Sequence, residues 1–551
     1  MKLFPNKLSQ IHLVLLVAGF LTFTSNFTFF EKTLLVYPLS ENLFFLGSLF
    51  ILLFTLLASL LLLVCYRKTT KPILILLLLT SSLVGYSTNN YGIVFDHNMI
   101  TNTFETGSSE FLDLVNFKSF LYLLILGLLP SIAVWKVKLS KTQSKLETEF
   151  ASKIFGKIKP QYVPHVAQFL QRVKVFLILV IVSSVIILSF SKHYSSFFRE
   201  NKHLRTYVIP TYYLYSLAKF TNSKIATSTK PFVEIGLDAK INKKSAQRRL
   251  VILIVGETAR SDHMSLNGYE RKTNPFLEQE EIISFKEMVS CGTDTAWSVP
   301  CMFSLLDREN YNHTSGKNMS NSLDLISRAG ASVLWLDNNS DSKGVAERVP
   351  YEDYRSSKLN SICNPECRDE GMLIDIQNYI DEQNNNDILI VLHTMGSHGP
   401  AYFKRYPPEF EVFMPSCKTS QLNECTDEEI SNAYDNTILY TDYFLSKVIA
   451  VLKANSVNSD TAMLYISDHG ESLGENGLYL HGMPYFMAPD EQIKIPAFMW
   501  FDESISRIFD IASIKEKAQL SQSHDSLFHT LLGLMDVETE LYEKDLDLTA
   551  K

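Results

Sequence analysis

The most restrictive feature of this 551-residue sequence is a set of long apolar runs, all within the first 190 residues. Most of them approach the ~20 residues that an α-helix needs to cross a bilayer. We identify five such runs, near residues 11–30, 43–66, 72–85, 120–137 and 173–190. The third is short and extends toward Tyr91 if its polar end is included. No cleavage site of small residues follows the first run, which excludes a removed signal peptide. The sequence therefore predicts five membrane-spanning helices.

Charged residues indicate on which side of the membrane each connecting segment lies, because cytoplasmic segments are enriched in lysine and arginine. Basic residues precede the first run, separate the second from the third and separate the fourth from the fifth: Lys2, Lys7, Arg67, Lys68, Lys71, Lys136, Lys138, Lys141, Lys145, Lys153, Lys157 and Lys159. The segment between the third and fourth runs is acidic, with Asp96, Glu105, Glu110 and Asp113. This asymmetry predicts a cytoplasmic N-terminus and places everything after residue 190 outside the cytoplasm.

The cysteines are consistent with that topology. Cys65 lies at the inner end of the second run, and the other six fall in the predicted exterior part as three close pairs: Cys291 with Cys301, Cys363 with Cys367, and Cys417 with Cys425. An even number in an oxidising compartment indicates disulfides, and nearest-neighbour pairing is our hypothesis among 15 possible pairings. A zinc site built from thiolates is the alternative, and it would need these cysteines grouped around one ion.

Residues 191–246 connect the membrane part to the rest. Aromatic residues alternate with basic ones in the first half, which suits short helices lying in the membrane interface and equally suits packing on the exterior domain. Residues 222–244 are polar and predict a linker. We therefore divide the chain into a transmembrane domain (1–190), interfacial helices with a linker (191–246) and an exterior domain (247–551).

The exterior domain shows the pattern of an α/β fold. Short apolar runs occur near residues 250–255, 332–336, 387–392, 462–466 and 496–501. Stretches with helical character separate most of them, near residues 319–329, 372–383 and 435–454. This alternation predicts a mostly parallel sheet with helices on both faces. No cluster of lysine and arginine interleaved with aromatics is present in this part, so nothing indicates nucleic-acid binding.

Polar side chains follow four of the predicted strands, at the edge where parallel α/β sheets collect their chemistry. Glu257 follows the first strand, Asn339 the second, His393 and His398 the third, and Asp468 with His469 the fourth. Singly, each has an ordinary explanation as a helix-start acid or a tight-turn residue. Together, carboxylates and imidazoles at four strand ends predict a metal site, and a set of oxygen and nitrogen ligands suits zinc, with manganese as the alternative.

The stretch from Cys291 to Met302 contains a candidate nucleophile. Two cysteines bracket Thr293 and Thr295, and Ser298 and Pro300 have the order of a helix cap and an early helical residue. A threonine just ahead of a helix start lies where backbone N–H groups and the helix dipole favour phosphate. The stretch therefore predicts either a covalent phosphoryl carrier or a disulfide-closed surface loop with incidental threonines.

Seven motifs in the exterior domain resemble those of the lipid A phosphoethanolamine transferases, the family that includes the mobile colistin-resistance enzymes. They are Gly-Glu-Thr-Ala-Arg at 256–260, Asn-Gly-Tyr at 267–269, Cys-Gly-Thr-Asp-Thr-Ala-Trp-Ser-Val-Pro-Cys-Met-Phe-Ser at 291–304, Asp-Asn-Asn-Ser-Asp-Ser-Lys-Gly at 337–344, Met-Gly-Ser-His-Gly-Pro at 395–400, Ser-Asp-His-Gly-Glu-Ser-Leu-Gly-Glu at 467–475 and His-Gly at 481–482. The resemblance extends over nearly the whole chain and implies a catalytic domain of the alkaline phosphatase and sulfatase group. The spacing of Cys363 and Cys367 is tighter than we expect for this family.

The resemblance also implies roles for individual residues. The positions that match zinc ligands are Glu257, Thr295, Asp468 and His469, and Thr295 rather than Thr293 matches the nucleophile. The positions that match residues holding the substrate phosphate or a second zinc are Asn339, Lys343, His398 and His481, of which either histidine is a candidate proton donor and acceptor. Glu471 and Glu475 either support the metal site or begin a helix, and we favour the helix.

From this family resemblance we expect transfer of phosphoethanolamine from phosphatidylethanolamine to a phosphate of lipid A or lipopolysaccharide, by a monomer in the bacterial inner membrane with a periplasmic catalytic domain. Bacteria that carry this modified lipid A would resist cationic peptides such as polymyxin. The alternatives are another acceptor, such as a lipopolysaccharide core sugar or a periplasmic glucan, or phosphoglycerol transfer. A membrane-tethered sensor without activity and a sulfatase are further alternatives.

Overall fold

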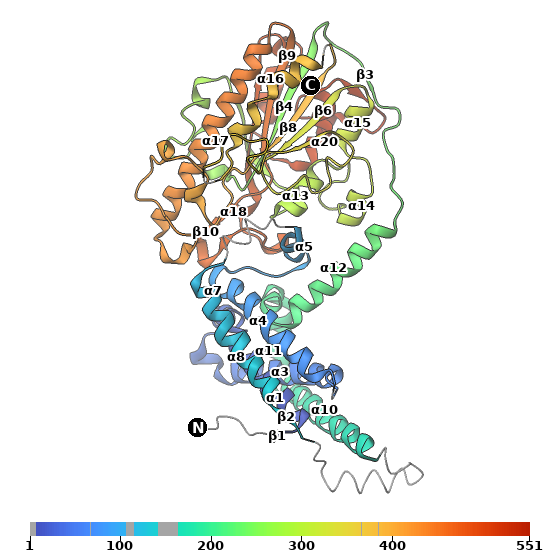
Figure 1. The fold of residues 1–551 in the computed structure, drawn as a ribbon, viewed down its shortest axis with the longest axis vertical. Coiled ribbons are helices and arrows are strands. Elements are labelled where there is room, and N and C mark those ends of the chain that lie inside the picture. The colour runs from blue at the N-terminus through green and yellow to red at the C-terminus, as the bar shows by residue number, and fades with distance from the viewer. Residues whose placement is uncertain (1–6, 67, 106–114, 141–162, 365, 384) are drawn as a thin grey trace. The chain divides into compact units, whose positions relative to one another are not determined.

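The computed structural model describes residues 7–551 except 67, 106–114, 141–162, 365 and 384 (Figure 1). The chain forms two compact units. The N-terminal unit comprises Met1–Phe95 and Val115–Ser216, and the C-terminal unit comprises Asp96–Leu114 and Leu217–Lys551. The segment that starts at Asp96 therefore leaves the N-terminal unit between two of its helices and packs with the C-terminal unit.

The N-terminal unit is helical. Its main helices are α1 (Gln10–Thr24), α2 (Phe27–Val36), α3 (Leu39–Val64), α4 (Thr70–Tyr91), the run of α7 (Phe117–Tyr122), η1 (Leu123–Leu128) and α8 (Leu129–Lys136), and α10 (Val163–Ser189). Within the described residues, four helices are long and apolar enough to cross a membrane, and the bent pair α1–α2 makes a fifth if it is one span. The predicted set of spans is confirmed in this sense.

The spans differ from the prediction in three places. The first is not one straight helix, because it bends by 54° between α1 and α2. Asn26 lies at the bend. Its side-chain amide donates to the carbonyl of Ile209 and accepts from the N–H of Ile209, at 2.9 Å each. The third span does continue to Tyr91, where Gly92 ends it in the left-handed conformation. The fifth helix begins at Val163 rather than near residue 173.

The connector is more ordered than its sequence predicts. It contains α11 (Ser191–Glu200), η3 (Lys202–Tyr207) and α12 (Thr211–Thr229), so the first part of the predicted linker is helical. Further along, β3 (Lys240–Ile241) pairs with β14 (Val537–Glu538). Phe197 is buried in the N-terminal unit, edge-on to Phe29 and Phe45. Several aromatics of this segment therefore pack on the helices, which neither of our two interpretations foresaw.

Some of the charges used for the orientation lie outside the described residues: Lys2, Arg67, Glu110, Asp113 and the five lysines between residues 141 and 159. The orientation of the N-terminus therefore stays a prediction.

An eight-stranded sheet forms the centre of the C-terminal unit, in the order β13-β5-β12-β9-β4-β8-β6-β7. The strands are β13 (Gln522–Ser523), β5 (Ile283–Val289), β12 (Lys494–Phe501), β9 (Ser459–Ser467), β4 (Arg248–Gly256), β8 (Ile388–His393), β6 (Ser332–Asp337) and β7 (Tyr351–Asp353). Strand β12 is antiparallel to both neighbours and every other pairing is parallel. The prediction of a mostly parallel sheet is confirmed.

Helices cover both faces of this sheet, with α17 on one side and α15 and α20 on the other (Figure 1). From Thr295 onward, the α-helices of this unit are α13 (Thr295–Met302), α14 (His313–Lys317), α15 (Ser322–Arg328), α16 (Ile376–Glu382), α17 (Asp427–Asn455), α18 (Asp490–Ile493), α19 (Ile511–Lys517) and α20 (Leu527–Leu534). Alternate residues of β4, such as Val251 and Leu253, join one apolar core with α15 and α20. This burial on both faces explains why the central strands are nearly continuous apolar runs.

Two predicted helices have different bounds. The stretch 372–383 divides into a 3-10 turn, η7 (Asp369–Leu373), and the shorter α16. Helix α17 starts at Asp427, eight residues before the predicted position, because Thr426 and Glu429 form a capping box there.

All three predicted disulfides are present: Cys291–Cys301, Cys363–Cys367 and Cys417–Cys425. Cys65 is free and buried at the end of α3. The pairing agrees with nearest-neighbour spacing, and the alternative of a thiolate zinc site is excluded for these six residues.

Replacing Arg249 by leucine is predicted to destabilise the C-terminal unit. Its guanidinium is only 2% exposed and pairs with Asp460 at 3.3 Å and with Asp536 at 2.9 Å. Removing one partner of a buried ion pair leaves the other charges uncompensated, and we expect a loss of about 3–5 kcal/mol. Denaturant unfolding of the full chain in detergent measures it by fluorescence, because Trp297, Trp335 and Trp500 lie in this unit.

Arg507→Ala is the matched control. Arg507 pairs with Glu503 one turn earlier, and both side chains are largely exposed, at 74% and 87%. Exposed pairs contribute little, so its unfolding curve should overlay that of the wild type. Equal effects of the two variants would contradict the importance of the buried cluster.

Candidate metal centre

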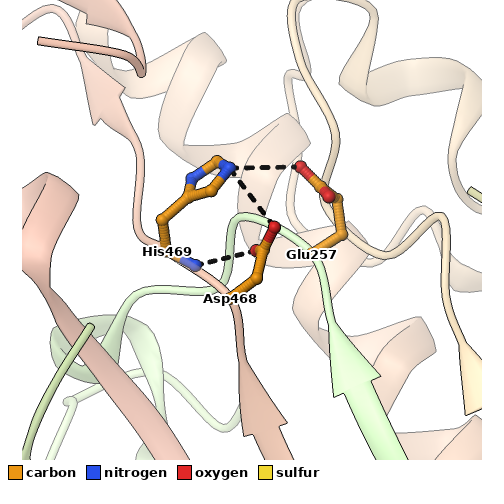
Figure 2. Close-up of side chains that lie close together, drawn as sticks. All are labelled: Glu257, Asp468 and His469. Carbon is orange, nitrogen blue, oxygen red and sulfur yellow. Dashed lines mark hydrogen bonds and ion pairs between the residues drawn. The ribbon is translucent and has the colours of Figure 1, made fainter. Parts of the chain in front are cut away.

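Three potential metal ligands meet at the carboxyl edge of the sheet (Figure 2). Glu257 directly follows β4, and Asp468 and His469 directly follow β9. Their potential ligand atoms all lie within 4.8 Å of one another. His469 Nε2 is 3.7 Å from Glu257 Oε1 and 3.5 Å from Asp468 Oδ2. Strands β4 and β9 are parallel neighbours, and Gly256 lies opposite Ser467. The residues that follow these two strands, Glu257 and Asp468, therefore lie side by side at the same edge of the sheet.

Local hydrogen bonds fix the orientation of these side chains. Asp468 Oδ1 accepts the backbone N–H groups of His469 at 2.7 Å and Thr258 at 3.2 Å, which directs Oδ2 toward His469 Nε2. His469 Nδ1 lies 2.9 Å from the carbonyl oxygen of Gly470. Since a carbonyl only accepts, Nδ1 carries the proton and Nε2 presents its lone pair to the cluster. The histidine is therefore in the tautomer that binds a metal.

Thr295 brings a hydroxyl to the same place. Its Oγ1 is 3.1 Å from Glu257 Oε2, to which it donates, and 3.3 Å from His469 Nε2. Thr295 is the first residue of α13, so it lies at the end of the helix where backbone N–H groups favour negative charge. The structure thus joins the candidate nucleophile to the candidate ligands.

The predicted cap of that helix was wrong. Asp294 caps α13 by accepting the N–H of Trp297 at 3.0 Å, while Ser298 and Pro300 lie inside the helix. Aspartate is among the strongest N-caps, and its position starts the helix four residues earlier than Ser298 would. This shift places Thr295 in the first turn rather than in a loop.

The donor set fits a divalent cation. Glu257, Asp468, His469 and Thr295 are at most 5% exposed. Burial, together with the nearby His481, lowers the pKa of His469 to about 4, which keeps the imidazole neutral. Burial raises the pKa of Asp468, but His469 and His393 outweigh it and hold that pKa below its ordinary value. Burying two carboxylates beside a neutral imidazole and a hydroxyl is energetically unfavourable unless a cation balances their charge.

The residues assigned to the substrate surround this cluster on one side. Asn339 Nδ2 donates to Glu257 Oε2 at 2.6 Å and to the carbonyl of Thr394 at 2.8 Å. The His481 ring lies 4.4 Å from the His469 ring and 5.8 Å from the His398 ring. Lys343 is buried in the same loop as Asn339, where its Nζ donates to the carbonyl of Ser340 at 2.7 Å. The structure therefore brings Asn339 and His481 to the metal-site residues and His398 to His481, and it buries Lys343 in the loop that carries Asn339.

Glu471 has a different environment from the helix start that we favoured from the sequence. No helix starts there, because β10 (Ser472–Leu473) follows and pairs with β11 (Tyr479–Leu480). Glu471 is fully buried, and its carboxylate accepts from Tyr402 Oη at 2.6 Å and from His481 Nδ1 at 2.9 Å. It therefore sets the orientation of the His481 ring. Glu475 pairs with Arg260 at 2.5 Å and begins a short 3-10 helix, η11 (Glu475–Gly477), as we favoured for this residue.

His393 is a second histidine whose ring is oriented by a carboxylate, that of Asp337. Asp337 Oδ2 lies 2.9 Å from His393 Nδ1 and accepts from Trp335 Nε1 at 2.9 Å. The carboxylate holds the proton on Nδ1, and His393 Nε2 is buried without a hydrogen-bond partner among the described residues. The sequence placed His393 at a strand end but gave it no role, because its partner is 56 residues away.

Comparison with known proteins identifies the family. Residues 249–537 match the family described as Sulfatase, and residues 53–158 and 150–225 match the family described as Phosphoethanolamine transferase EptA/EptB. The chain is 41% identical over 534 residues to phosphatidylethanolamine transferase Mcr-2 of Escherichia coli, with 95% of this chain and 94% of the relative covered. The chain belongs to the phosphoethanolamine transferase family.

Two further relatives extend the similarity to the whole fold. Phosphoethanolamine transferase EptA of Escherichia coli strain K12 is 36% identical over 545 residues, which cover 97% of this chain and 95% of that protein. The structure of the integral membrane lipooligosaccharide phosphoethanolamine transferase A from Neisseria meningitidis is 33% identical, covers 99% of both chains and has a TM-score of 0.91. The expected combination of a helical membrane domain with an α/β domain is therefore confirmed.

Asp468→Asn is predicted to remove a bound divalent ion. The amide keeps the shape of the side chain but loses the negative charge that a hard cation requires. We expect about one metal ion per chain in the wild type and a small fraction of that in the variant, after dialysis against a weak chelator. Elemental analysis by mass spectrometry measures both.

Asp442→Asn provides the control for a generic loss of a buried carboxylate. Asp442 is 1% exposed and accepts the backbone N–H groups of Phe276 and Leu277, away from the cluster. Its metal content should equal that of the wild type. A wild-type protein without metal, or equal losses in both variants, would contradict the assignment of the centre.

Proposed function

We propose that this phosphoethanolamine transferase moves phosphoethanolamine from phosphatidylethanolamine to a phosphate group of lipid A, through a covalent intermediate on Thr295. The observation that carries the proposal is the position of Thr295 Oγ1, 3.1 Å from Glu257 and 3.3 Å from His469, inside the buried cluster. The names of the relatives support the donor and the transferred group. The name of the Neisseria meningitidis protein, a lipooligosaccharide phosphoethanolamine transferase, supports a lipid A type of acceptor.

In this proposal Glu257, Asp468, His469 and the Thr295 hydroxyl hold zinc, which oxygen and nitrogen ligands without thiolate suit. When bound, zinc supplies Lewis-acid chemistry: it lowers the pKa of a coordinated hydroxyl and offsets charge on phosphoryl oxygens. Glu257 also accepts a hydrogen bond from the Asn339 amide at 2.6 Å, which holds the carboxylate in place. We expect one tightly held ion, with His398 and His481 as donors to a second, weaker one.

In the first half-reaction the Thr295 hydroxyl passes its proton to Glu257 Oε2, to which it donates at 3.1 Å. Oγ1 forms a bond with the phosphorus of the donor, and the bond between phosphorus and the diacylglycerol oxygen breaks. The N-terminal end of α13 favours the negative charge of the phosphoryl group. His481 is placed to give a proton to the departing oxygen, because Glu471 binds its Nδ1 at 2.9 Å and so turns Nε2 away from the carboxylate. Lys343 and Asn339 are the proposed contacts of the phosphoryl oxygens.

The second half-reaction returns Thr295 to its starting state. An oxygen of the acceptor phosphate attacks the phosphothreonine, the bond to Oγ1 breaks, and phosphoethanolamine leaves on the acceptor. Oγ1 takes back its proton from Glu257. His398 or His481 accepts any proton that the acceptor oxygen carries. Such a double displacement predicts ping-pong kinetics.

The domain arrangement is part of the proposal. Residues 1–190 anchor the chain in the inner membrane, residues 191–246 connect, and residues 247–551 form the catalytic domain in the periplasm, with the N-terminus in the cytoplasm. Both substrates are lipids with phosphates at headgroup level, so anchoring confines the search to the membrane plane and raises the effective concentration. The product carries an added ammonium group, which reduces binding of cationic peptides such as polymyxin.

Thr295→Ala is predicted to abolish transfer. The variant lacks the only atom that forms the covalent bond, and mass spectrometry of the tryptic peptide should show no phosphoethanolamine adduct. Thr293→Ser is the control, because Thr293 Oγ1 donates to the carbonyl of Met483 at 2.6 Å and serine keeps that bond. Undiminished transfer by Thr295→Ala in membranes would refute the role of this hydroxyl.

The acceptor is tested by mass spectrometry of lipid A from a host that expresses the chain. We expect an increase by one phosphoethanolamine on lipid A and increased polymyxin survival, both absent with Thr295→Ala. An unmodified lipid A with an altered core sugar or glucan would overturn the acceptor assignment. A phosphoglycerol increment would overturn the identity of the transferred group.

A further inference from the structure

The nucleophile and the metal-site residues come from strands that do not pair with each other. Cys291 and Thr295 follow β5, while Asp468 and His469 follow β9, and β12 separates these two strands in the sheet. The ladder between β4 and β9 aligns Glu257 with Asp468, but no strand pairing aligns Thr295 with either. Another contact must set the distance between the two loops.

His524 provides such a contact. It follows the edge strand β13, whose Ser523 pairs with Val289 of β5, and its side chain is 1% exposed. His524 Nδ1 lies 3.0 Å from the backbone nitrogen of Cys291, and Nε2 lies 2.9 Å from the carbonyl oxygen of Ser467. One imidazole thus bonds the backbones of both loops.

Only one protonation state of the ring satisfies both bonds. The Cys291 N–H can only donate and the Ser467 carbonyl can only accept, so Nδ1 must carry a lone pair and Nε2 the proton. Burial lowers the pKa of His524 to about 4, against the opposing effect of the Ser467 carbonyl, so the ring is neutral in the physiological range. A second proton would place two N–H groups against each other at Cys291.

Both ends of this bridge lead directly to the reacting groups. Ser467 precedes Asp468, and its hydroxyl donates to the carbonyl of His469 at 3.0 Å and accepts from Ala259 at 2.9 Å. Cys291 begins the short segment that ends at Asp294 and Thr295, and its disulfide to Cys301 ties it to the far end of α13. A shift at either end therefore moves the hydroxyl relative to the metal ligands.

We propose that His524 is a positioning residue for phosphoryl transfer, which bridges the loop before Thr295 to the strand end that carries Asp468 and His469. The inference rests on the proposed function, since it assigns His524 to the same site. The ring nitrogens of His524 bond backbone groups of Cys291 and Ser467, and in this proposal it acts through the two backbones that it joins.

The test uses two variants of the full-length protein in membranes and detergent. His524→Asn retains an acceptor near the position of Nδ1, and His524→Gln retains a donor near the position of Nε2, so each keeps one of the two bonds. We expect kcat to fall about ten- to hundredfold in both, the range typical when a residue behind a metal site is lost. The KM for the phosphatidylethanolamine donor should change less than threefold, and zinc affinity, measured by competition with a chelator, should fall by at least threefold.

His529→Asn is the matched control. His529 is also buried at 2% exposure, and its Nδ1 also accepts a backbone N–H, from Glu543 at 3.0 Å, but it lies on α20 away from the cluster. It should lower the unfolding midpoint as much as the His524 variants while kcat and zinc affinity stay within twofold of wild type. The proposal is overturned if the His524 variants keep both values within twofold, or if His529→Asn loses them equally.

The outcome also separates this inference from the proposed function. If the wild type and His529→Asn transfer no phosphoethanolamine, the proposed function has failed, and zinc affinity alone then decides the role of His524. Weaker zinc binding in the His524 variants would support the bridge, and unchanged binding would refute it.

Discussion

The site depends on the parallel pairing of β4 with β9. Nine consecutive residue pairs, from Arg248 with Ser459 to Gly256 with Ser467, bring the two strands to the same edge of the sheet. Glu257 and Asp468 are the next residues of each strand, so their separation is set by the backbone ladder rather than by flexible loops. Gly256 is needed at this point, because a Cβ there would lie 2.4 Å from the hydroxyl of Tyr465.

Burial sets the protonation states of the ligand side chains and makes the cluster unfavourable when no cation is bound. Carboxylates at 0–1% exposure beside a neutral imidazole are unfavourable in a protein interior unless a cation compensates them. A neutral His469 and an ionised Asp468 are the protonation states that a divalent ion requires. Outside the cluster, Glu471 orients His481 and Asp337 orients His393, so carboxylates also fix the orientation of two neighbouring histidines. The pattern is that of a preorganised site on rigid elements.

The central strands and the ligands at their ends could be predicted from sequence because both follow from local order. A continuous apolar run such as residues 250–255 indicates a strand buried on both faces, and the next polar residue must then lie at the sheet edge. Strand β5 was not predicted, because Lys286 and Glu287 interrupt its apolar pattern at exposed positions in its middle. The bend between α1 and α2 was missed because it depends on the bond from Asn26 to Ile209, 183 residues away.

The same reasoning explains the errors within the site. The sequence analysis named Ser298 as the cap of α13, whereas Asp294 takes that role through the hydrogen bond that it accepts from Trp297. Glu471 resembled a helix-start acid in the sequence. Its partner Tyr402 is 69 residues away, so the local pattern could not show their hydrogen bond. His524 gave no signal at all, because its two partners are backbone groups of distant loops. Long-range hydrogen bonds of this kind are what a local pattern cannot predict.

The most direct test of the account is anomalous X-ray diffraction from crystals of the zinc-loaded protein, recorded on both sides of the zinc absorption edge. The account predicts one strong peak about 2.0–2.2 Å from ligand atoms of Glu257, Asp468 and His469, with the Thr295 hydroxyl beside it. A peak held by other residues, or none in this cluster while zinc is present in the crystal, would contradict the claim that a metal ion at the edge of the sheet activates this threonine.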